Sequence, residues 1–115
     1  MSYNILIPFN VVVIPYQVVG RYPTKLRNFT GSDLDDLRGA IKLAEGLPDA
    51  ASLLRLSAGK PGEGKQDLYD LRKNFKLDGF FDFRRFIEEY FINEDNPILV
   101  ELPCKYYSFY FNHGN

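Results

Sequence analysis

Residues that bind metals or cross-link chains are scarce in this sequence. It contains one cysteine, Cys104, and one histidine, His113, among 115 residues. A single cysteine cannot form an intrachain disulfide, and the two residues together cannot supply the nitrogen and sulfur ligands of a zinc site. We therefore predict that the protein uses neither a metal ion nor a cofactor.

An excess of one charge and a long hydrophobic run are also missing. Lys and Arg number 14 against 15 Asp and Glu, so no overall field attracts nucleic acid or an anionic membrane. No apolar run approaches the roughly 18–20 residues that cross a bilayer. The first basic residue, Arg21, follows the apolar start of the chain, whereas a secretory signal requires basic residues before its apolar region. These features predict a soluble, cytoplasmic protein that does not contact a membrane.

The composition is that of a folded chain. The sequence is 45% hydrophobic and 25% charged, well away from the pattern of disordered segments. Its length suits one domain, which at this size buries about 60–68% of the surface of the unfolded chain. We expect a single globular α+β domain over residues 1–115, with residues 112–115 as a frayed tail.

Strand-like segments lie near both ends of the chain. Residues 3–19 are rich in β-branched side chains without helical spacing, which predicts a hairpin or one bent strand. Residues 98–102 and 105–111 predict two closing strands. Residues 21–29 are polar and contain Pro23, so we interpret them as a connecting loop.

The middle of the chain predicts helices. Ser32 is a candidate cap for the first, with Asp35 at the reciprocal capping position and an apolar stripe over residues 34–47. A second helix is predicted over residues 48–58, although residues 53–57 fit a strand as the alternative.

Two further helices follow along the chain. The third is predicted over residues 66–76, with Asp78 and Gly79 ending it. The fourth helix begins after the candidate cap Asp82. Phe81, which precedes this cap, is expected to pack on Phe86 as a hydrophobic staple. Its apolar face is predicted to contain Phe83, Phe86, Ile87, Tyr90 and Phe91.

The order of strands, then helices, then strands predicts the architecture. We expect an antiparallel sheet of about four strands built from the N- and C-terminal segments. Three or four helices from the middle of the chain should pack on one of its faces.

Aromatic side chains are concentrated in two segments. Twelve of the 18 Phe and Tyr residues fall in residues 75–91 and 106–111, more rings than a small core readily absorbs. Tyrosine is enriched at protein interfaces, so some of these rings should face a partner.

We interpret the chain as a non-enzymatic protein that binds and inhibits another protein, such as a toxin or nuclease. An immunity protein, an antitoxin or a phage-type inhibitor would act in this way. The predicted partner-binding residues are Tyr106, Tyr107 and Tyr110 as anchors and Glu88, Glu89, Glu94 and Asp95 as a charged rim.

Two alternative functions have sequence features of their own. Lys105, Tyr107 and Phe109 alternate on one face of a predicted strand, where rings beside a cation can stack single-stranded bases. Basic residues elsewhere could assist such binding: Lys60, Lys65, Arg72 and Lys73.

The second alternative is nucleotide binding at residues 59–66. Gly59, Gly64 and Lys65 match the spacing of a phosphate-binding loop, but Gln66 replaces the Ser or Thr that would hold magnesium. A solvated glycine-rich connection explains the same residues.

Catalytic residues are not evident in the sequence. Cys104 and His113 are nine positions apart on either side of a predicted strand, which does not suggest a nucleophile and its base. No pair of carboxylates stands out for acid–base chemistry. We predict that the protein is not an enzyme.

Overall fold

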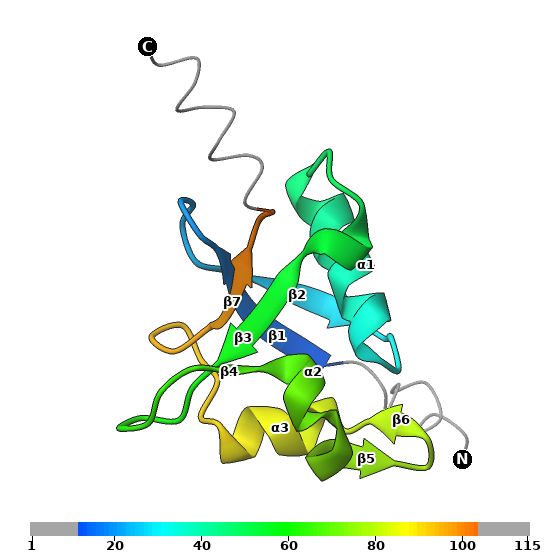
Figure 1. The fold of residues 1–115 in the computed structure, drawn as a ribbon, viewed down its shortest axis with the longest axis vertical. Helices are drawn as coiled ribbons and strands as arrows, with labels where there is room; N and C mark the ends of the chain where they lie inside the picture. Colours follow the sequence, from blue (N-terminus) through cyan, green and yellow to red (C-terminus); the bar gives the residue numbers. More distant parts are fainter. Residues whose placement is uncertain (1–11, 104–115) are drawn as a thin grey trace, which may run out of the picture.

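The chain forms an α+β fold with a mixed five-stranded sheet and three α-helices (Figure 1). Its structure is a computed structural model that describes residues 12–103. The order of strands across the sheet is β2-β1-β7-β3-β4. These strands are β1 (Val12–Val18), β2 (Thr24–Phe29), β3 (Arg55–Ala58), β4 (Gln66–Asp67) and β7 (Ile98–Glu101).

The helices and a small hairpin cover one side and one end of this sheet. In Figure 1, α1 lies beside the sheet, whereas α2, α3 and the β5–β6 hairpin lie below it. No helix within residues 12–103 is long and apolar enough to cross a membrane. The bounds are α1 (Leu34–Glu45), α2 (Leu68–Leu71) and α3 (Phe83–Glu89), the 3₁₀ turns η2 (Ala51–Leu53) and η3 (Arg72–Phe75), and the hairpin strands β5 (Lys76–Leu77) and β6 (Phe80–Phe81).

The prediction of a wholly antiparallel sheet is wrong at its centre. β1 pairs with β7 in parallel, Tyr16 lying opposite Ile98, while the other strand pairs are antiparallel. A hairpin fixes only the relative direction of β1 and β2. β7 returns to β1 after the entire helical part of the chain, and a connection of that length permits either direction.

The predicted loop over residues 21–29 is also wrong in its second half. β2 pairs antiparallel with β1, and the turn between them contains Gly20 with φ 95°. β2 was missed because it is an edge strand in which four of the six side chains are polar, including Lys25 and Arg27. Charged side chains are typical of edge strands, since they discourage pairing with other molecules.

Two of the predicted helices are largely replaced by other structure. The helix expected over residues 48–58 is a 3₁₀ turn followed by β3, so the alternative strand interpretation was nearer to the structure. The helix expected over residues 66–76 is divided into β4, α2 and η3. Its inward residues are nevertheless as predicted, because Leu68, Leu71 and Phe75 are all buried.

The cap of α1 lies one residue later than predicted. Asp33, not Ser32, is the N-cap: its carboxylate accepts a hydrogen bond of 2.9 Å from the Asp36 amide. Asp36 in turn accepts bonds from the backbone amides of Ser32 and Asp33, which completes a capping box. Asp35 is therefore not needed as a cap and is available for other contacts.

The fourth predicted helix is confirmed as α3. Asp82 caps it, and the ring of Phe81 lies 5.6 Å from that of Phe86, as the predicted staple requires. Phe91 differs from the prediction, because it is 60% exposed and has φ 53°. The left-handed backbone at Phe91 ends the helical path before this ring can turn inward.

The core joins one face of the sheet to all three helices. Ile14, Tyr16 and Val18 alternate into it from β1, and Leu37 and Phe86 reach it from α1 and α3. Five of the seven aromatic residues between positions 75 and 91 are buried there, and Phe80 and Phe91 are exposed. The predicted strand over 105–111 and the tail over 112–115 lie outside the described residues.

Candidate functional site

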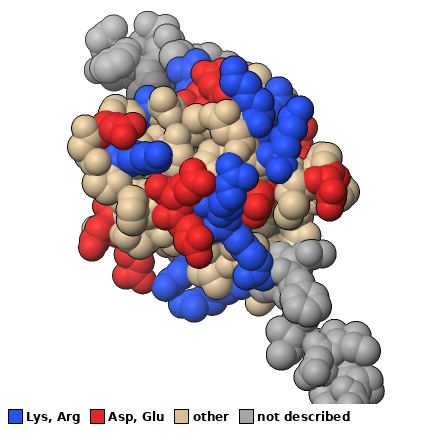
Figure 2. All heavy atoms as spheres, turned by 90° about the horizontal axis from the view of Figure 1, so that it is seen from below, with Lys and Arg blue, Asp and Glu red and all other residues tan. Residues whose placement is uncertain are grey.

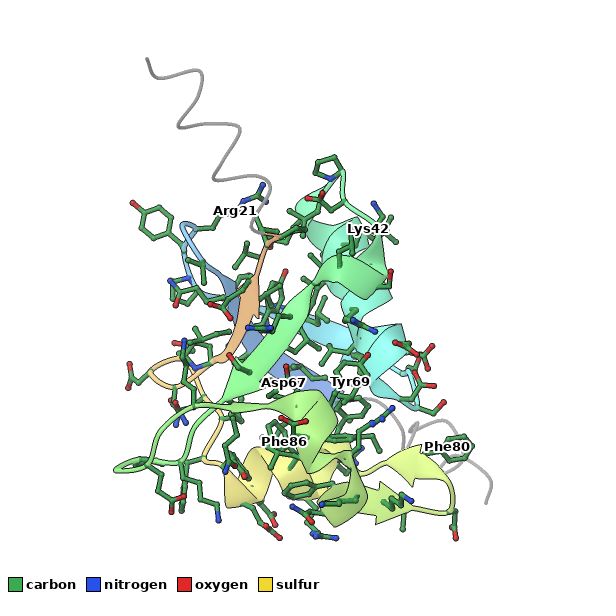
Figure 3. All side chains as sticks on the ribbon, viewed as in Figure 1. Arg21, Lys42, Asp67, Tyr69, Phe80 and Phe86 are labelled. Atoms are coloured by element: carbon green, nitrogen blue, oxygen red, sulfur yellow. The ribbon has the colours of Figure 1, made fainter. Side chains whose placement is uncertain are left out.

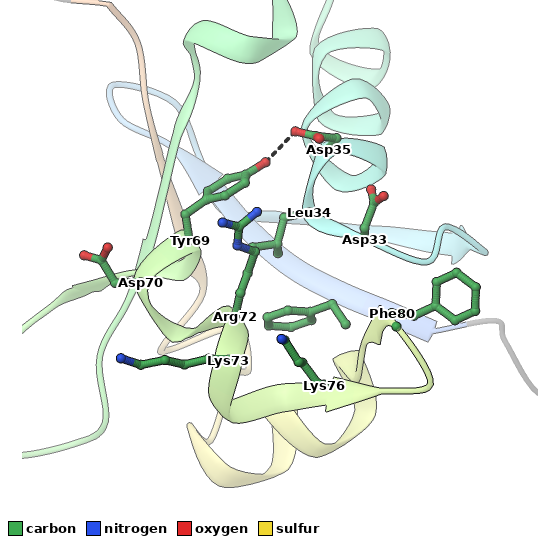
Figure 4. Close-up of a pocket in the computed structure, with 11 residues that line it drawn as sticks. Asp33, Leu34, Asp35, Tyr69, Asp70, Arg72, Lys73, Lys76 and Phe80 are labelled. Atoms are coloured by element: carbon green, nitrogen blue, oxygen red, sulfur yellow. Dashed lines mark hydrogen bonds between the residues drawn. The ribbon is translucent and has the colours of Figure 1, made fainter.

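A groove of about 620 Å³ lies between the start of α1 and the segment that runs from α2 to β6 (Figure 4). A pocket of this size is large enough for a small molecule or for a few side chains of a partner. Phe80 is exposed at one end of the groove, whereas Leu34 and Phe81, which also line it, are buried in the core. Its charged residues are Asp33, Asp35, Asp70, Arg72, Lys73 and Lys76.

One wall of the groove is a hydrogen-bonded cluster around Asp35. The Tyr69 hydroxyl donates to the Asp35 carboxylate at 2.7 Å, and the Arg38 guanidinium donates to the same oxygen at 2.6 Å. The hydrogen bond from Arg38, with that from Tyr69, lowers the pKa of Asp35 below its usual value. Asp35 is thus a carboxylate whose charge is already matched within the protein.

Tyr69 is held between two cations. The guanidinium carbons of Arg38 and Arg72 lie 4.4 Å and 5.0 Å from the centre of its ring, within range of cation–π attraction. Burial, followed by the hydrogen bond to Asp35, raises the pKa of Tyr69 above its usual value. Arg38 also donates to the carbonyl oxygens of Ser52 and Leu54, which ties α1 to η2. The cluster has a structural role that requires no ligand.

Removing the Tyr69 hydroxyl tests that role. Tyr69→Phe should lower the free energy of unfolding by about 1 kcal/mol, because it removes one hydrogen bond to a carboxylate that is mostly exposed. Urea denaturation is the measurement. Tyr22→Phe is the matched control, since Tyr22 is 91% exposed and should give no change. Equal effects of the two substitutions would contradict a stabilising role for this bond.

The far end of the groove is built by the β5–β6 hairpin. Its two-residue turn, Asp78 and Gly79, has φ values of 51° and 84°. Positive φ at both positions is the mark of the type I′ turn, for which Asp-Gly is a favoured pair. The hairpin brings Leu77 directly opposite Phe80, and each of these side chains is 55% exposed.

The hairpin is fixed firmly to the rest of the domain. The Phe81 amide donates to the Ser32 carbonyl at 2.9 Å, and the Asp82 amide donates to the Phe75 carbonyl at 2.7 Å. Phe75 and Phe81 are buried on either side of the hairpin. Figure 3 shows the difference between Phe86, enclosed among the helices, and Phe80, which stands at the periphery of the molecule. Leu77 and Phe80 are therefore exposed apolar side chains on a rigid support.

Three basic side chains of the groove are available to a ligand. Arg72, Lys73 and Lys76 are exposed, and within residues 12–103 none of them forms an ion pair with a carboxylate. Two of the acidic side chains, by contrast, are engaged, Asp33 in the cap of α1 and Asp35 with Arg38. Asp70 is exposed as well and forms no ion pair within residues 12–103, so the accessible charge of the groove is mixed, with three basic groups beside one unpaired carboxylate.

The predicted acidic rim lies elsewhere on the surface. Glu88 and Glu89 are exposed on α3, and Glu89 pairs with Arg85 at 3.0 Å. Glu94 and Asp95 belong to the turn before β7, where Glu94 pairs with Lys25 at 2.9 Å. That contact, first through its hydrogen bond, lowers the pKa of Glu94. Ion pairs within the chain thus occupy two members of the predicted rim.

The glycine-rich segment 59–66 connects two antiparallel strands. It joins β3 to β4, so no helix starts at Lys65, whereas a phosphate-binding loop passes from a strand into a helix. Its two ends lie close together, since a Cβ atom at Gly59 would be 3.1 Å from the Gly64 carbonyl oxygen. The structure gives a hairpin connection here, in line with the structural explanation of its glycines.

The predicted aromatic anchors are not described by the structure. Tyr106, Tyr107 and Tyr110 lie outside residues 12–103, as do Lys105 and Phe109 of the nucleic-acid alternative. Cys104 and His113 lie outside them too. Within the described part, no three side chains of His, Cys, Asp and Glu gather as a metal site.

The sequence analysis did not identify Leu77 and Phe80 as exposed residues of a hairpin. The signal was present, because an Asp-Gly pair between apolar residues is the strongest short hairpin pattern. We interpreted Asp78 and Gly79 as the end of a helix, and that assignment concealed the exposure of the residues beside them. Of the basic residues proposed for nucleic acid, Arg72 and Lys73 lie in the groove, and Lys60 lies over the ring of Tyr90 at 5.2 Å.

The surface around this region carries both charge signs. Figure 2, which views the molecule from below, shows basic and acidic side chains interleaved rather than a continuous field of one sign. A long phosphate backbone favours an extended basic surface.

Comparisons with known proteins identify a family without a stated activity. No curated protein and no solved structure matches the chain. One family model matches residues 12–103, the same part of the chain that forms the sheet and helices. The chain therefore belongs to the family described as a domain of unknown function, DUF8732.

Proposed function

We propose that this protein is a non-enzymatic binding domain that docks another protein through a surface termed here the hairpin surface, formed by Leu77, Phe80 and the adjoining groove. The observation that carries the proposal is the pair of exposed apolar side chains on the β5–β6 hairpin. Single exposed apolar residues are common on proteins and need no explanation. Two that face each other across a rigid hairpin, next to a groove, are better suited to act as anchors.

Rigidity supports this assignment. Binding costs less when the anchoring side chains are already held in place, because little conformational freedom remains to be lost. The backbone bonds from Phe81 to Ser32 and from Asp82 to Phe75 hold the hairpin on the core. The anchors of protein interfaces are typically aromatic or aliphatic groups in such well-supported positions.

The proposal keeps the class of function suggested by the sequence and moves the site. The tyrosines at 106, 107 and 110 remain predicted contacts outside the described residues, and the acidic residues of the rim are partly engaged with Arg85 and Lys25. Inhibition of the partner, as by an immunity protein or an antitoxin, is one consequence that such docking would have.

The test compares a double variant with a matched control. Leu77→Ser with Phe80→Ser removes both anchors, and Leu43→Ser removes an apolar side chain that is 85% exposed on α1. Proteins from the source cells that are retained by the wild-type chain are identified, purified and titrated by calorimetry. The double variant should weaken the dissociation constant of the partner by at least about 30-fold, and the control by less than about two-fold.

Thermal unfolding of each variant checks that the fold is kept, because both changes affect exposed side chains. A partner that binds the double variant and the wild-type chain equally well would refute the hairpin surface as its docking site. Failure to retain any protein would count against the proposed function itself.

A further inference from the structure

The groove beside the hairpin has an asymmetric arrangement of charge and apolar surface. Figure 4 places Phe80 at one end and Asp70 at the other, with Arg72 and Lys76 between them and Lys73 along the lower edge. A ligand that spans the groove would therefore meet an aromatic ring and basic groups in sequence. This combination limits the chemistry of what can bind.

The basic side chains favour a ligand with carboxylates. The side chains of Lys73 and Lys76 form no hydrogen bond or ion pair within the described part, and the guanidinium of Arg72 lies over the Tyr69 ring without a hydrogen bond to a carboxylate there. A carboxylate between them would gain charge-assisted hydrogen bonds. It would displace no existing ion pair.

The acidic side chains of the groove disfavour nucleic acid. Asp33 and Asp70 line the same groove as the three cations. A nucleic-acid strand carries one phosphate per nucleotide, so some of its charges would face these carboxylates. A peptide can place one or two acidic side chains near Lys73 and Lys76 and other residues elsewhere.

Phe80 and its neighbours provide the second part of the recognition. Phe80 is 55% exposed, whereas Leu34 and Phe81, which also line the groove, are buried at 1% and 7% exposure. An aromatic or large aliphatic side chain of a ligand would bury apolar surface against Phe80, which favours binding. A free carboxylate alone would leave this part of the groove unused.

We infer that the groove binds a segment of the partner protein in which acidic side chains flank an aromatic or large aliphatic one. The inference rests on the proposed function and adds the chemistry of the partner. Arg72, Lys73 and Lys76 bind the carboxylates, and Phe80 binds the apolar side chain. The specificity comes from the combination, since neither part alone distinguishes this segment from other peptides.

A set of synthetic peptides tests the inference directly. The probe is the fluorescein-labelled peptide Gly-Glu-Glu-Phe-Glu-Gly, with one version that has Lys in place of each Glu and another that has Ala in place of Phe. Fluorescence anisotropy measures their dissociation constants with the intact protein. The acidic aromatic peptide should bind at least about ten-fold more tightly than either altered version, and added salt should weaken it through screening.

Charge reversal in the protein supplies the matched control. Lys73→Glu with Lys76→Glu should weaken the acidic aromatic peptide at least about ten-fold, because it replaces two attractive contacts with repulsive ones. Lys60→Glu with Lys65→Glu makes the same change in net charge on the β3–β4 connection and should alter the affinity by less than about two-fold.

The outcomes separate this inference from the proposed function. Lack of measurable binding, equal binding of acidic and basic peptides, or equal effects of the two charge reversals would overturn the inference. Tighter binding of a single-stranded oligonucleotide, lost in Lys73→Glu with Lys76→Glu, would also overturn it by assigning the groove to nucleic acid. A natural partner that requires Leu77 and Phe80 but tolerates this charge reversal would leave the proposed function intact and reject the acidic segment.

Discussion

Replacing Phe86 with alanine should lower the free energy of unfolding of the domain by about 3–5 kcal/mol. Phe86 is fully buried, and its ring contacts those of Phe75, Phe81 and Tyr90 at 4.8–5.6 Å between centres. Removal of the ring loses the free energy gained by transferring it from water into the core. It also leaves a cavity, because the neighbouring side chains are held by their own contacts and cannot fill the space. Domains of this size are typically stable by only about 5–15 kcal/mol, so the variant should be close to unfolding.

Urea denaturation of Phe86→Ala and Phe91→Ala makes the comparison. Phe91 lies five residues later on the chain and is 60% exposed, so the same change there should cost less than about 1 kcal/mol. Similar losses for the two variants would contradict the placement of α3, because its orientation is what puts Phe86 inside and Phe91 outside.

Gly31→Ala should also be strongly destabilising, by about 2–3 kcal/mol. A Cβ atom at Gly31 would lie 2.5 Å from the Asp36 Cβ atom and 2.5 Å from the end of the Phe29 ring. Neither neighbour is free to move, since Asp36 completes the capping box of α1 and Phe29 is buried against Phe83 at 5.1 Å. The connection from β2 to α1 must therefore shift to accept one methyl group.

Gly39→Ala, eight residues later, provides the opposite expectation. Position 39 lies inside α1, and a Cβ atom there would meet nothing within 4 Å. Alanine favours the helix over glycine, so this variant should be more stable than the wild type by about 0.5–1 kcal/mol. Thermal unfolding of Gly31→Ala and Gly39→Ala should show a loss of stability for the first and a gain for the second. Stabilisation by Gly31→Ala would contradict the close packing between β2 and α1.

Helix prediction succeeded where the sequence pattern and the packing agree. α3 has apolar residues at Phe83 and Phe86 and a cap at Asp82, and each of these features is present in the structure. α1 was predicted with its stripe but with the wrong cap, because Ser32 and Asp33 are both good caps and only the spatial position of Asp36 decides between them.

Strand prediction failed where tertiary pairing decides the conformation. β2 has few apolar side chains because it lies at the edge of the sheet. Its strand conformation is fixed by backbone hydrogen bonds with β1 and not by an apolar pattern in its sequence. β3 is only four residues long, a length at which an apolar run fits either a strand or a helix. Its position between β7 and β4 resolves the ambiguity.

The candidate site depends on two local conformations that the sequence pattern does not distinguish from their alternatives. Asp78 and Gly79 form a hairpin turn instead of a helix end, and the hairpin exposes Leu77 and Phe80 together. The cap at Asp33 leaves Asp35 to bind Arg38 and Tyr69, which shapes the opposite wall. In the aromatic-rich segment 75–91, the expectation that the aromatic residues exceed the core applies to Phe80 and Phe91, which are exposed, whereas Tyr90 is buried.

The central claim is that a partner protein docks on the hairpin surface, and amide hydrogen exchange of the complex tests it most directly. With the partner bound, slowed exchange should concentrate in the β5–β6 hairpin and in residues 68–75, which form the adjoining wall of the groove. The β3–β4 connection, at residues 59–65, should exchange as it does in the free protein. Protection of that connection, or of the turn at residues 93–96, with an unchanged hairpin would contradict the account.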